Sequence, residues 1–173
     1  MKAIGKLVGG VVAAGAAVYG GVNASGDETT RNDNGEIVES GGLGVMAMQD
    51  GDCFVLPDEE LITSVEAVPC TSPHSGQKFA DVALSDAAVF GEADAEVVLA
   101  DEVRFDDAVF EASMDLCFDR FEGFVGASYD ESALYFNALT PTVTGWQLGD
   151  REATCVIVPE TGLISFDAEG SGR

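Results

Sequence analysis

Four cysteines constrain this chain more than any other feature, because covalent bonds between them would tie distant segments together. Cys53, Cys70, Cys117 and Cys155 are separated by 17, 47 and 38 residues. No two of them form a Cys-x-x-Cys pair, which disfavours a zinc cluster or a thioredoxin-type redox centre. The sequence therefore predicts disulfides, each contributing about 2–4 kcal/mol to stability.

Four cysteines allow three pairings. We favour Cys53–Cys70, which would join neighbouring strands. The complementary bond, Cys117–Cys155, would join the principal helix to the last strand. The competing pairing joins Cys53 to Cys155 and Cys70 to Cys117.

The first 24 residues differ from the rest of the chain. Lys2 and Lys6 precede an uncharged run of small and apolar residues, and residues 1–24 contain no acid. The tripeptide ending at Ala24 fits the small-x-small rule for signal-peptidase cleavage. The run is short and rich in glycine compared with the roughly 20 apolar residues of a stable spanning helix. A cleaved signal peptide and a retained membrane anchor both remain open, and both predict an extracytoplasmic protein whose cysteines oxidise.

Acidic side chains dominate the remainder. The chain has eight Lys and Arg against 31 Asp and Glu, a formal net charge of −23, and the leader holds two of those basic residues. Such a surface repels nucleic acid and anionic lipid headgroups, which excludes nucleic acid as a partner and leaves membrane contact to the N-terminal segment. We interpret the charge as a solvated acidic surface that confers solubility and suits a salt-rich habitat.

Composition divides the exported part into three. Residues 25–43 are polar and glycine-rich, which predicts a flexible acidic tether. Within them, Asn32–Glu36 is similar to part of a calcium loop, but Thr30 and Gly41 occupy its first and twelfth positions, so we interpret it as a turn. Residues 44–160 are expected to form the domain, and residues 161–173 a frayed tail.

One segment predicts the principal helix. Between Phe105 and Phe124, apolar residues recur at spacings of four, three, four and three, and Gly123 and Gly126 are available to end the helix. This stripe is expected to face the core. Its members are Phe110, Met114, Cys117, Phe121 and Phe124.

Short apolar segments between turn residues predict strands. They are Val45–Met48, Cys53–Leu56, Ile62–Val68, Lys78–Leu84, Leu134–Leu139 and Glu152–Val158. Trp146, the single tryptophan, is expected to pack over the core. The expected fold class is α+β: a small, mainly antiparallel sheet with one principal helix and two disulfides, preceded by the leader and tether.

The sequence contains no recognisable catalytic motif. His74 is the single histidine, so metal motifs with two histidines cannot form. There is no Gly-x-Ser-x-Gly elbow and no phosphate-binding loop. We therefore expect no enzymatic activity, no cofactor and no metal site. The His74 ring is expected to bond a backbone group or a carboxylate and to fix the loop after Cys70.

The order of several short motifs carries a resemblance. They are Gly51-Asp52-Cys53-Phe54, then Val68-Pro69-Cys70-Thr71-Ser72-Pro73-His74, then Cys117, then Trp146-Gln147-Leu148-Gly149-Asp150-Arg151 leading to Cys155. Over residues 44–160 this order resembles the actinobacterial septum-formation domain family of exported or single-pass envelope proteins. Gln77 and Lys78 depart from it, since the family usually has a glutamate and then an aliphatic residue there. The resemblance implies a link to the division septum or cell wall and no particular enzymatic activity.

The matched residues lead to two hypotheses about function. Asp52 and Asp150 are expected to cap turns, with Arg151 paired to one of them. In the first hypothesis, the protein is a non-enzymatic envelope module that binds another envelope protein or a cell-wall component. Its best candidates for an exposed recognition surface are Pro73, His74, Trp146 and Arg151.

In the alternative, it is a small cell-wall hydrolase or ligand-binding protein that uses His74 and nearby carboxylates. A pocket holding His74 beside a carboxylate and an aligned hydroxyl would favour this alternative. A hydrogen bond from the His74 ring to backbone would favour the first hypothesis.

Overall fold

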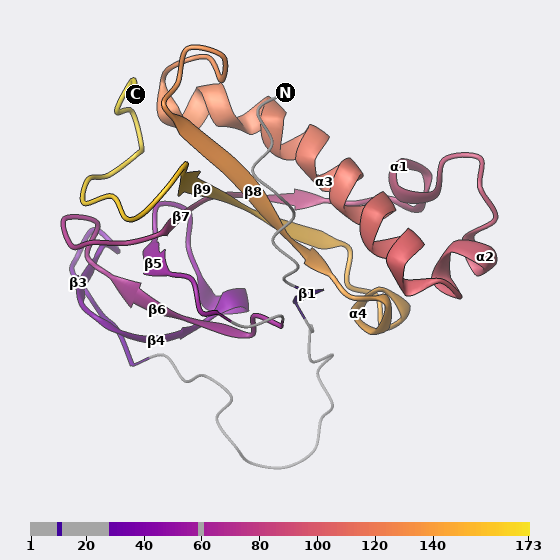
Figure 1. The fold of residues 1–173 in the computed structure, drawn as a ribbon. Helices are drawn as coiled ribbons and strands as arrows, with labels where there is room; N and C mark the ends of the chain where they lie inside the picture. Colours follow the sequence, from indigo (N-terminus) through magenta and orange to yellow (C-terminus); the bar gives the residue numbers. More distant parts are fainter. Residues whose placement is uncertain (1–9, 12–27, 59–60) are drawn as a thin grey trace.

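The computed structural model describes residues 10–11, 28–58 and 61–173 (Figure 1). The leader expected at residues 1–24 lies outside these residues except for Gly10 and Val11, so its assignment as a signal peptide or anchor stays a prediction. Among the described residues, no helix is long and apolar enough to cross a membrane.

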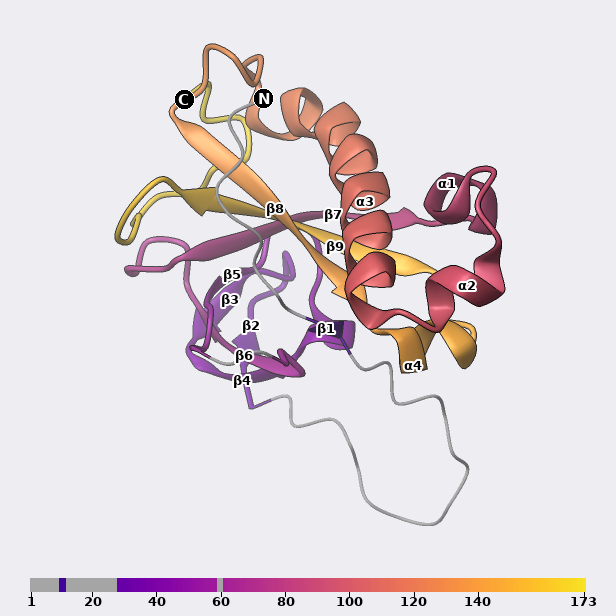
Figure 2. The same cartoon turned by 45° about the vertical axis from the view of Figure 1, so that its right-hand side comes forward.

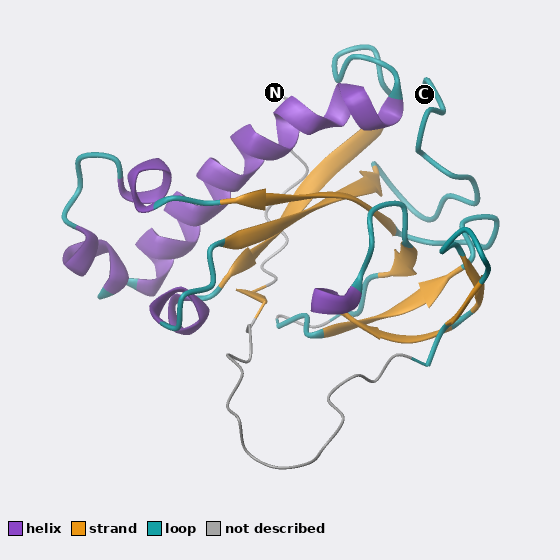
Figure 3. Ribbon diagram, turned by 180° about the vertical axis from the view of Figure 1, so that it is seen from behind, coloured by secondary structure: helices purple, strands orange, loops and turns teal. Residues whose placement is uncertain are grey.

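The described chain is an α+β domain, as expected. Its strands and helices, in chain order, are β1 (Gly10–Val11), β2 (Thr30–Arg31), β3 (Ile37–Glu39), β4 (Gly41–Gly44), the 3-10 helix η1 (Val45–Ala47), β5 (Cys53–Val55), β6 (Ser64–Val68), β7 (Gly76–Ala83), α1 (Asp86–Phe90), α2 (Ala95–Leu99), α3 (Glu102–Val125), β8 (Leu134–Pro141), α4 (Val143–Gln147) and β9 (Glu152–Pro159). Helices α1 to α4 gather at one side of the molecule, and strands β2 to β6 lie at the other together with η1 (Figures 2 and 3).

The main sheet has seven strands in the order β1-β8-β9-β7-β5-β6-β4. All neighbours in it are antiparallel except β1 and β8, which pair in parallel. Strand β9 lies between β7 and β8 and is buried on both faces. Ala153, Cys155 and Ile157 face the cluster under α3, whereas Val156 and Val158 face a second cluster with β4, β5 and β6. Burial on both faces explains why β9 is a nearly continuous apolar run rather than an alternating one.

Helix α3 confirms the predicted principal helix. It begins after Asp101, whose carboxylate accepts a hydrogen bond from the Arg104 amide, and it ends at Gly126, which has a positive φ of 80°. The most buried side chains recur every four residues, which is one row along the helix. They are Phe105, Val109, Ser113, Cys117, Phe121 and Val125.

The predicted stripe is therefore correct for Cys117 and Phe121 but slightly rotated. Phe110, Met114 and Phe124 are half-buried at the flank of the buried row. The bond from Cys117 to β9 sets which row of the helix faces the sheet.

The region before the predicted domain differs from expectation. Residues 28–43, expected as a flexible tether, contain β2, β3 and most of β4. Two apolar residues attach them to the core, since Leu43 is inaccessible to solvent and Ile37 is nearly so. The polar composition concealed these two anchors. The predicted turn at Asn32–Glu36 is confirmed, because the Asn32 side chain accepts hydrogen bonds from the Asn34 and Glu36 amides.

Three further elements before α3 were not expected. Val45–Ala47 is a 3-10 helix rather than a strand, with Met46 exposed to solvent. The acidic stretch before α3 contains α1 and α2, whose first turns are capped by the side chains of Ser85 and Asp94. These caps satisfy free amides, and the buried side chains of Val89, Phe90 and Val98 attach both short helices to the core.

The C-terminal residues are packed rather than frayed. The Gly170 and Gly172 amides donate to the carbonyls of Phe124 and Val125, and Ala168 is inaccessible to solvent. The segment thus satisfies carbonyls that the last turn of a helix leaves without intrahelical partners. Glycine-rich composition concealed this role, because the bonds use backbone and not side chains.

Candidate functional site

The favoured disulfide pairing is confirmed. Cys53 bonds to Cys70 with a Cα–Cα distance of 5.1 Å, and Cys117 bonds to Cys155 with a Cα–Cα distance of 5.6 Å. The first bond joins the first residue of β5 to the segment after β6, and the second joins α3 to β9. The motif residues lie around these two bonds.

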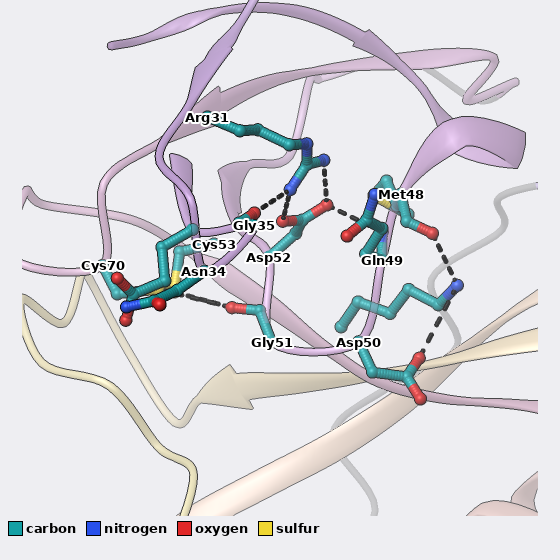
Figure 4. A network of polar contacts seen from close by, with 12 residues as sticks. Arg31, Asn34, Gly35, Met48, Gln49, Asp50, Gly51, Asp52, Cys53 and Cys70 are labelled. Carbon is teal, nitrogen blue, oxygen red and sulfur yellow. Dashed lines mark hydrogen bonds and ion pairs between the residues drawn. A yellow bond between two sulfur atoms is a disulfide. The ribbon is translucent and has the colours of Figure 1, made fainter. Parts of the chain in front are cut away.

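Asp52 is held by an arginine that the sequence analysis missed. The Arg31 guanidinium donates to both Asp52 carboxylate oxygens, over 2.6 and 2.7 Å, and also to the Gly35 carbonyl (Figure 4). Asp52 also accepts from the Gln49 amide, which confirms the expected turn cap. The expected pairing of Arg151 with Asp52 or Asp150 is wrong. Arg31 precedes Asp52 by 21 residues in the supposed tether, so no local pattern indicated the pair.

His74 is buried and engaged with backbone. Its ring Nδ1 lies 2.8 Å from the Ser72 carbonyl, and its backbone exchanges two hydrogen bonds with Ile164. Within residues 28–58 and 61–173, Nε2 has no hydrogen-bond partner. The ring therefore fixes the loop after Cys70, as expected, while its burial keeps it from solvent.

Gln77 joins three segments of the chain. Its amide nitrogen donates to the Gly51 carbonyl over 3.0 Å and to Asp167 over 2.7 Å, and its oxygen accepts from the Ala168 amide. An ionised glutamate, which the septum-formation family usually has at this position, could accept a hydrogen bond from the Ala168 amide. It could not donate to the Gly51 carbonyl or to Asp167. Glutamine at position 77 therefore suits the contacts with the C-terminal segment of this chain.

Lys78, the second departure, has a buried ammonium group. Its Nζ donates to the Met48 carbonyl over 2.9 Å and to the Asp81 carboxylate over 2.5 Å, and it lies 3.7 Å from the Asp50 carboxylate. These contacts tie β7 to the turn before β5.

Trp146 is also buried, at the end of the β7–β9 pair that lies away from His74. It packs against the rings of Phe90 and Phe105 with centroid distances of 5.6 and 5.7 Å. The Arg151 guanidinium lies 3.7 Å from the centroid of the Trp146 ring and donates to the Trp146 carbonyl. Arg151 forms its ion pair with exposed Asp86, whose carboxylate lies 3.2 Å from the Arg151 Nε. The Asp150 carboxylate accepts from the Glu152 amide, in keeping with the expected turn cap.

The expected recognition surface is not formed as one exposed patch. Pro73 is exposed and Arg151 is half-buried, but His74 and Trp146 are 0% and 2% exposed. The two buried residues lie near opposite ends of β7. His74 lies just before the first residue of β7, whereas Trp146 lies shortly before β9, whose first residue, Glu152, pairs with Ala83 at the last residue of β7. The motifs hold the fold together instead of displaying these side chains.

A groove of about 710 Å³ lies beside the Cys53–Cys70 disulfide. Its walls come from residues 34–38, 49–53 and 68–72, with Asp167 and Glu169 from the C-terminal segment. The sequence alone did not indicate this groove, because two of its walls belong to segments expected to be the tether and the tail. The Gly51-Asp52-Cys53 motif and the start of the Cys70 motif did indicate the remaining walls.

The clearest pKa shifts in the described residues lie outside this groove. Burial, and then the Asp81 carboxylate, raise the pKa of Glu152, although Lys78 acts in the opposite direction. Burial also raises the pKa of Tyr129 and Tyr135, beside the end of α3. Among the described residues, no group of three His, Cys, Asp or Glu side chains is arranged to hold a metal ion.

Comparison with known proteins gives one family match. A family model described as septum formation matches residues 50–169, which include the groove walls around Gly51 and Cys70 and both disulfides. No curated protein matches the chain, and no solved structure does.

Proposed function

This chain belongs to the septum-formation family, and from that premise we propose that it is a non-enzymatic envelope module. It acts outside the cytoplasm, where it binds another envelope protein or a cell-wall component during septum or wall formation. It reaches that location through its N-terminal residues, as a secreted or membrane-anchored protein.

The location is supported by the two disulfides, which persist in oxidising compartments and are rare in the reducing cytosol. All four cysteines are consumed in these bonds. The basic and then apolar N-terminal sequence supports the same location.

The burial of His74 is the observation that carries the non-enzymatic proposal. A general acid or base must reach the proton that it transfers, within hydrogen-bond distance or through one water. The His74 ring has no solvent-accessible surface and its Nδ1 is bonded to the Ser72 carbonyl. It is also absent from the lining of the groove. These facts weigh against a hydrolase built on His74 and favour a binding role.

The proposal is tested by complementation in cells that lack the protein. Three versions are supplied: the full chain, a version without residues 1–24 that stays in the cytoplasm, and the full chain with His74→Gln. Septa are counted by microscopy, and protein amount and export are measured by immunoblotting. We expect the full chain and the His74→Gln variant to restore septation, and the cytoplasmic version to fail. Septation restored without export, or lost with a folded and exported His74→Gln variant, would overturn the proposal.

Intact mass provides a second test of location. The protein is isolated from the native envelope and alkylated without prior reduction. We expect no added alkyl group, because the four cysteines are paired. Four alkyl groups would contradict an oxidising location.

A further inference from the structure

We infer that the groove beside the Cys53–Cys70 disulfide is a docking site for a cationic peptide segment of a partner protein, in which lysine or arginine alternates with apolar residues. This inference rests on the proposed function as an interaction module and names the chemistry of its partner. Three properties of the groove carry it: its charge, its apolar surface and its rigidity.

The groove is lined by more carboxylates than nearby cations can neutralise. Five of its lining residues in the described chain are acidic and none is lysine or arginine. Arg31 pairs with Asp52, and the Lys78 ammonium, which pairs with Asp81, lies 3.7 Å from the Asp50 carboxylate. The Glu169 carboxylate has no hydrogen-bond or ion-pair partner among the described residues, and Glu169 lines the groove together with Gly51. The remaining negative charge is complementary to a cationic ligand.

Apolar surface accompanies these carboxylates. The Val38 side chain, which lines the groove, is 47% exposed, and Val68, Pro69 and the disulfide add further apolar lining. Lysine and arginine place their aliphatic stems on apolar surface and keep the charged group at a polar rim. A segment that alternates such residues with valine or leucine matches both parts of the lining. An anionic polymer would be repelled by the carboxylates, and an uncharged one would lack the charge attraction.

The walls are held in place before any partner arrives. The disulfide joins two of them, and the Arg31–Asp52 pair joins the segment around Gly35 to the turn at Gly51. Gln77 joins that turn to Asp167 and Ala168. A site ordered in advance loses less conformational entropy on binding. The overall charge of −23 further accelerates the encounter with cationic segments.

The test uses a capped six-residue peptide that alternates lysine and valine, titrated into the full chain at physiological salt by calorimetry. A peptide that alternates glutamine and valine is the control for the apolar contribution. Hydrogen exchange measured by mass spectrometry locates the bound peptide. We expect the lysine peptide to bind at least about tenfold more tightly than the glutamine peptide. We expect it to slow exchange in residues 49–53 and 68–72.

Two matched variants separate the groove from the acidic surface as a whole. The groove variant combines Glu36→Gln, Asp50→Asn and Glu169→Gln. The control variant combines Glu111→Gln, Asp115→Asn and Glu122→Gln on the exposed face of α3. Each removes three negative charges. We expect the groove variant to weaken lysine-peptide binding about tenfold, since it removes three carboxylates that each form a partly exposed ion pair with a lysine of the peptide. The control variant should change binding less than twofold.

Equal weakening by both variants, or exchange protection spread over α3, would overturn the inference in favour of non-specific attraction. Equal binding of the two peptides would overturn the cationic partner. Neither result bears on export or septation, which the complementation experiment measures. Conversely, a failure of complementation with intact peptide binding would overturn the proposed function and leave the chemistry of the groove in place.

Discussion

At the scale of single residues, buried polar side chains control how the loops around the groove are placed. The Asp52 side chain is 4% exposed and the Arg31 side chain 16% exposed. Two short, parallel hydrogen bonds from one guanidinium make this the strongest kind of side-chain ion pair. Removal of one partner would leave the other charge buried and unpaired, which costs more than the pair contributes.

We therefore predict that Arg31→Gln lowers the free energy of unfolding by about 3 kcal/mol, measured by urea denaturation. Arg31→Lys should lose less, because it keeps the charge but not the bidentate geometry. The double variant Arg31→Gln with Asp52→Asn should be more stable than Arg31→Gln alone, since it removes the unpaired charge. An Arg31→Gln protein with wild-type stability would contradict a structural role for the pair.

Glu152 provides a prediction about pH. Its pKa is raised by burial and by the carboxylates of Asp81 and Asp150. The folded state therefore holds this proton more tightly than the unfolded state, so the contribution of Glu152 to stability falls as pH rises from the ordinary pKa of about 4.3 through the raised value. We predict that Glu152→Gln is more stable than wild type at neutral pH. The two should converge below pH 4, measured as melting temperature across pH. A constant difference at all pH values would contradict the assignment.

At the scale of secondary-structure elements, two different devices hold the long helix to the sheet. One is apolar: the buried row of α3 covers the faces of β7, β8 and β9 that carry Phe79, Phe136 and Cys155. The other is polar, since the C-terminal segment supplies amides to the last carbonyls of the helix. The Cys117–Cys155 bond fixes the register of these contacts.

The two disulfides should contribute unequally. Loop-closure entropy predicts about 3 kcal/mol for the 17-residue separation of Cys53 and Cys70, and about 4 kcal/mol for the 38-residue separation of Cys117 and Cys155. We predict that replacement of the second pair by alanine lowers the free energy of unfolding more than replacement of the first. Chemical denaturation of the two double variants measures the difference. Larger destabilisation from loss of Cys53–Cys70 would show that ordering of the groove outweighs chain entropy.

At the scale of the whole molecule, charge repulsion opposes folding. A net charge of −23 on 173 residues destabilises the compact state, and salt screens that repulsion. The screening length falls from about 30 Å at 0.01 M salt to about 3 Å at 1 M.

We accordingly predict that the melting temperature rises as sodium chloride increases from 0.01 to 1 M, with most of the gain below about 0.2 M. The α3 control variant, with three fewer negative charges, should be more stable than wild type at low salt and gain less from added salt. A melting temperature independent of salt in both proteins would mean that the acidic groups are too far apart to repel one another significantly.

Strongly periodic and covalent features were determined by the sequence itself. The helix around Cys117 and the strands that contain Phe136 and Cys155 followed from apolar spacing. The cysteine positions favoured the correct disulfide pairing but left a competing one open, and the structure decided between them. The burial of Trp146 and the backbone bond of His74 followed from residue chemistry. These features depend on local patterns, which one chain displays directly.

Only the tertiary structure decided which polar segments belong to the domain. Arg31 bonds to Asp52, 21 positions away, and Gln77 bonds to Asp167, 90 positions away. No periodic pattern in the sequence indicates such partners. The C-terminal segment docks through backbone amides, which every sequence possesses. The groove arises where these segments converge on the Cys53–Cys70 bond. Its location was hidden from the sequence because contacts between distant polar groups are set by the folded path of the chain.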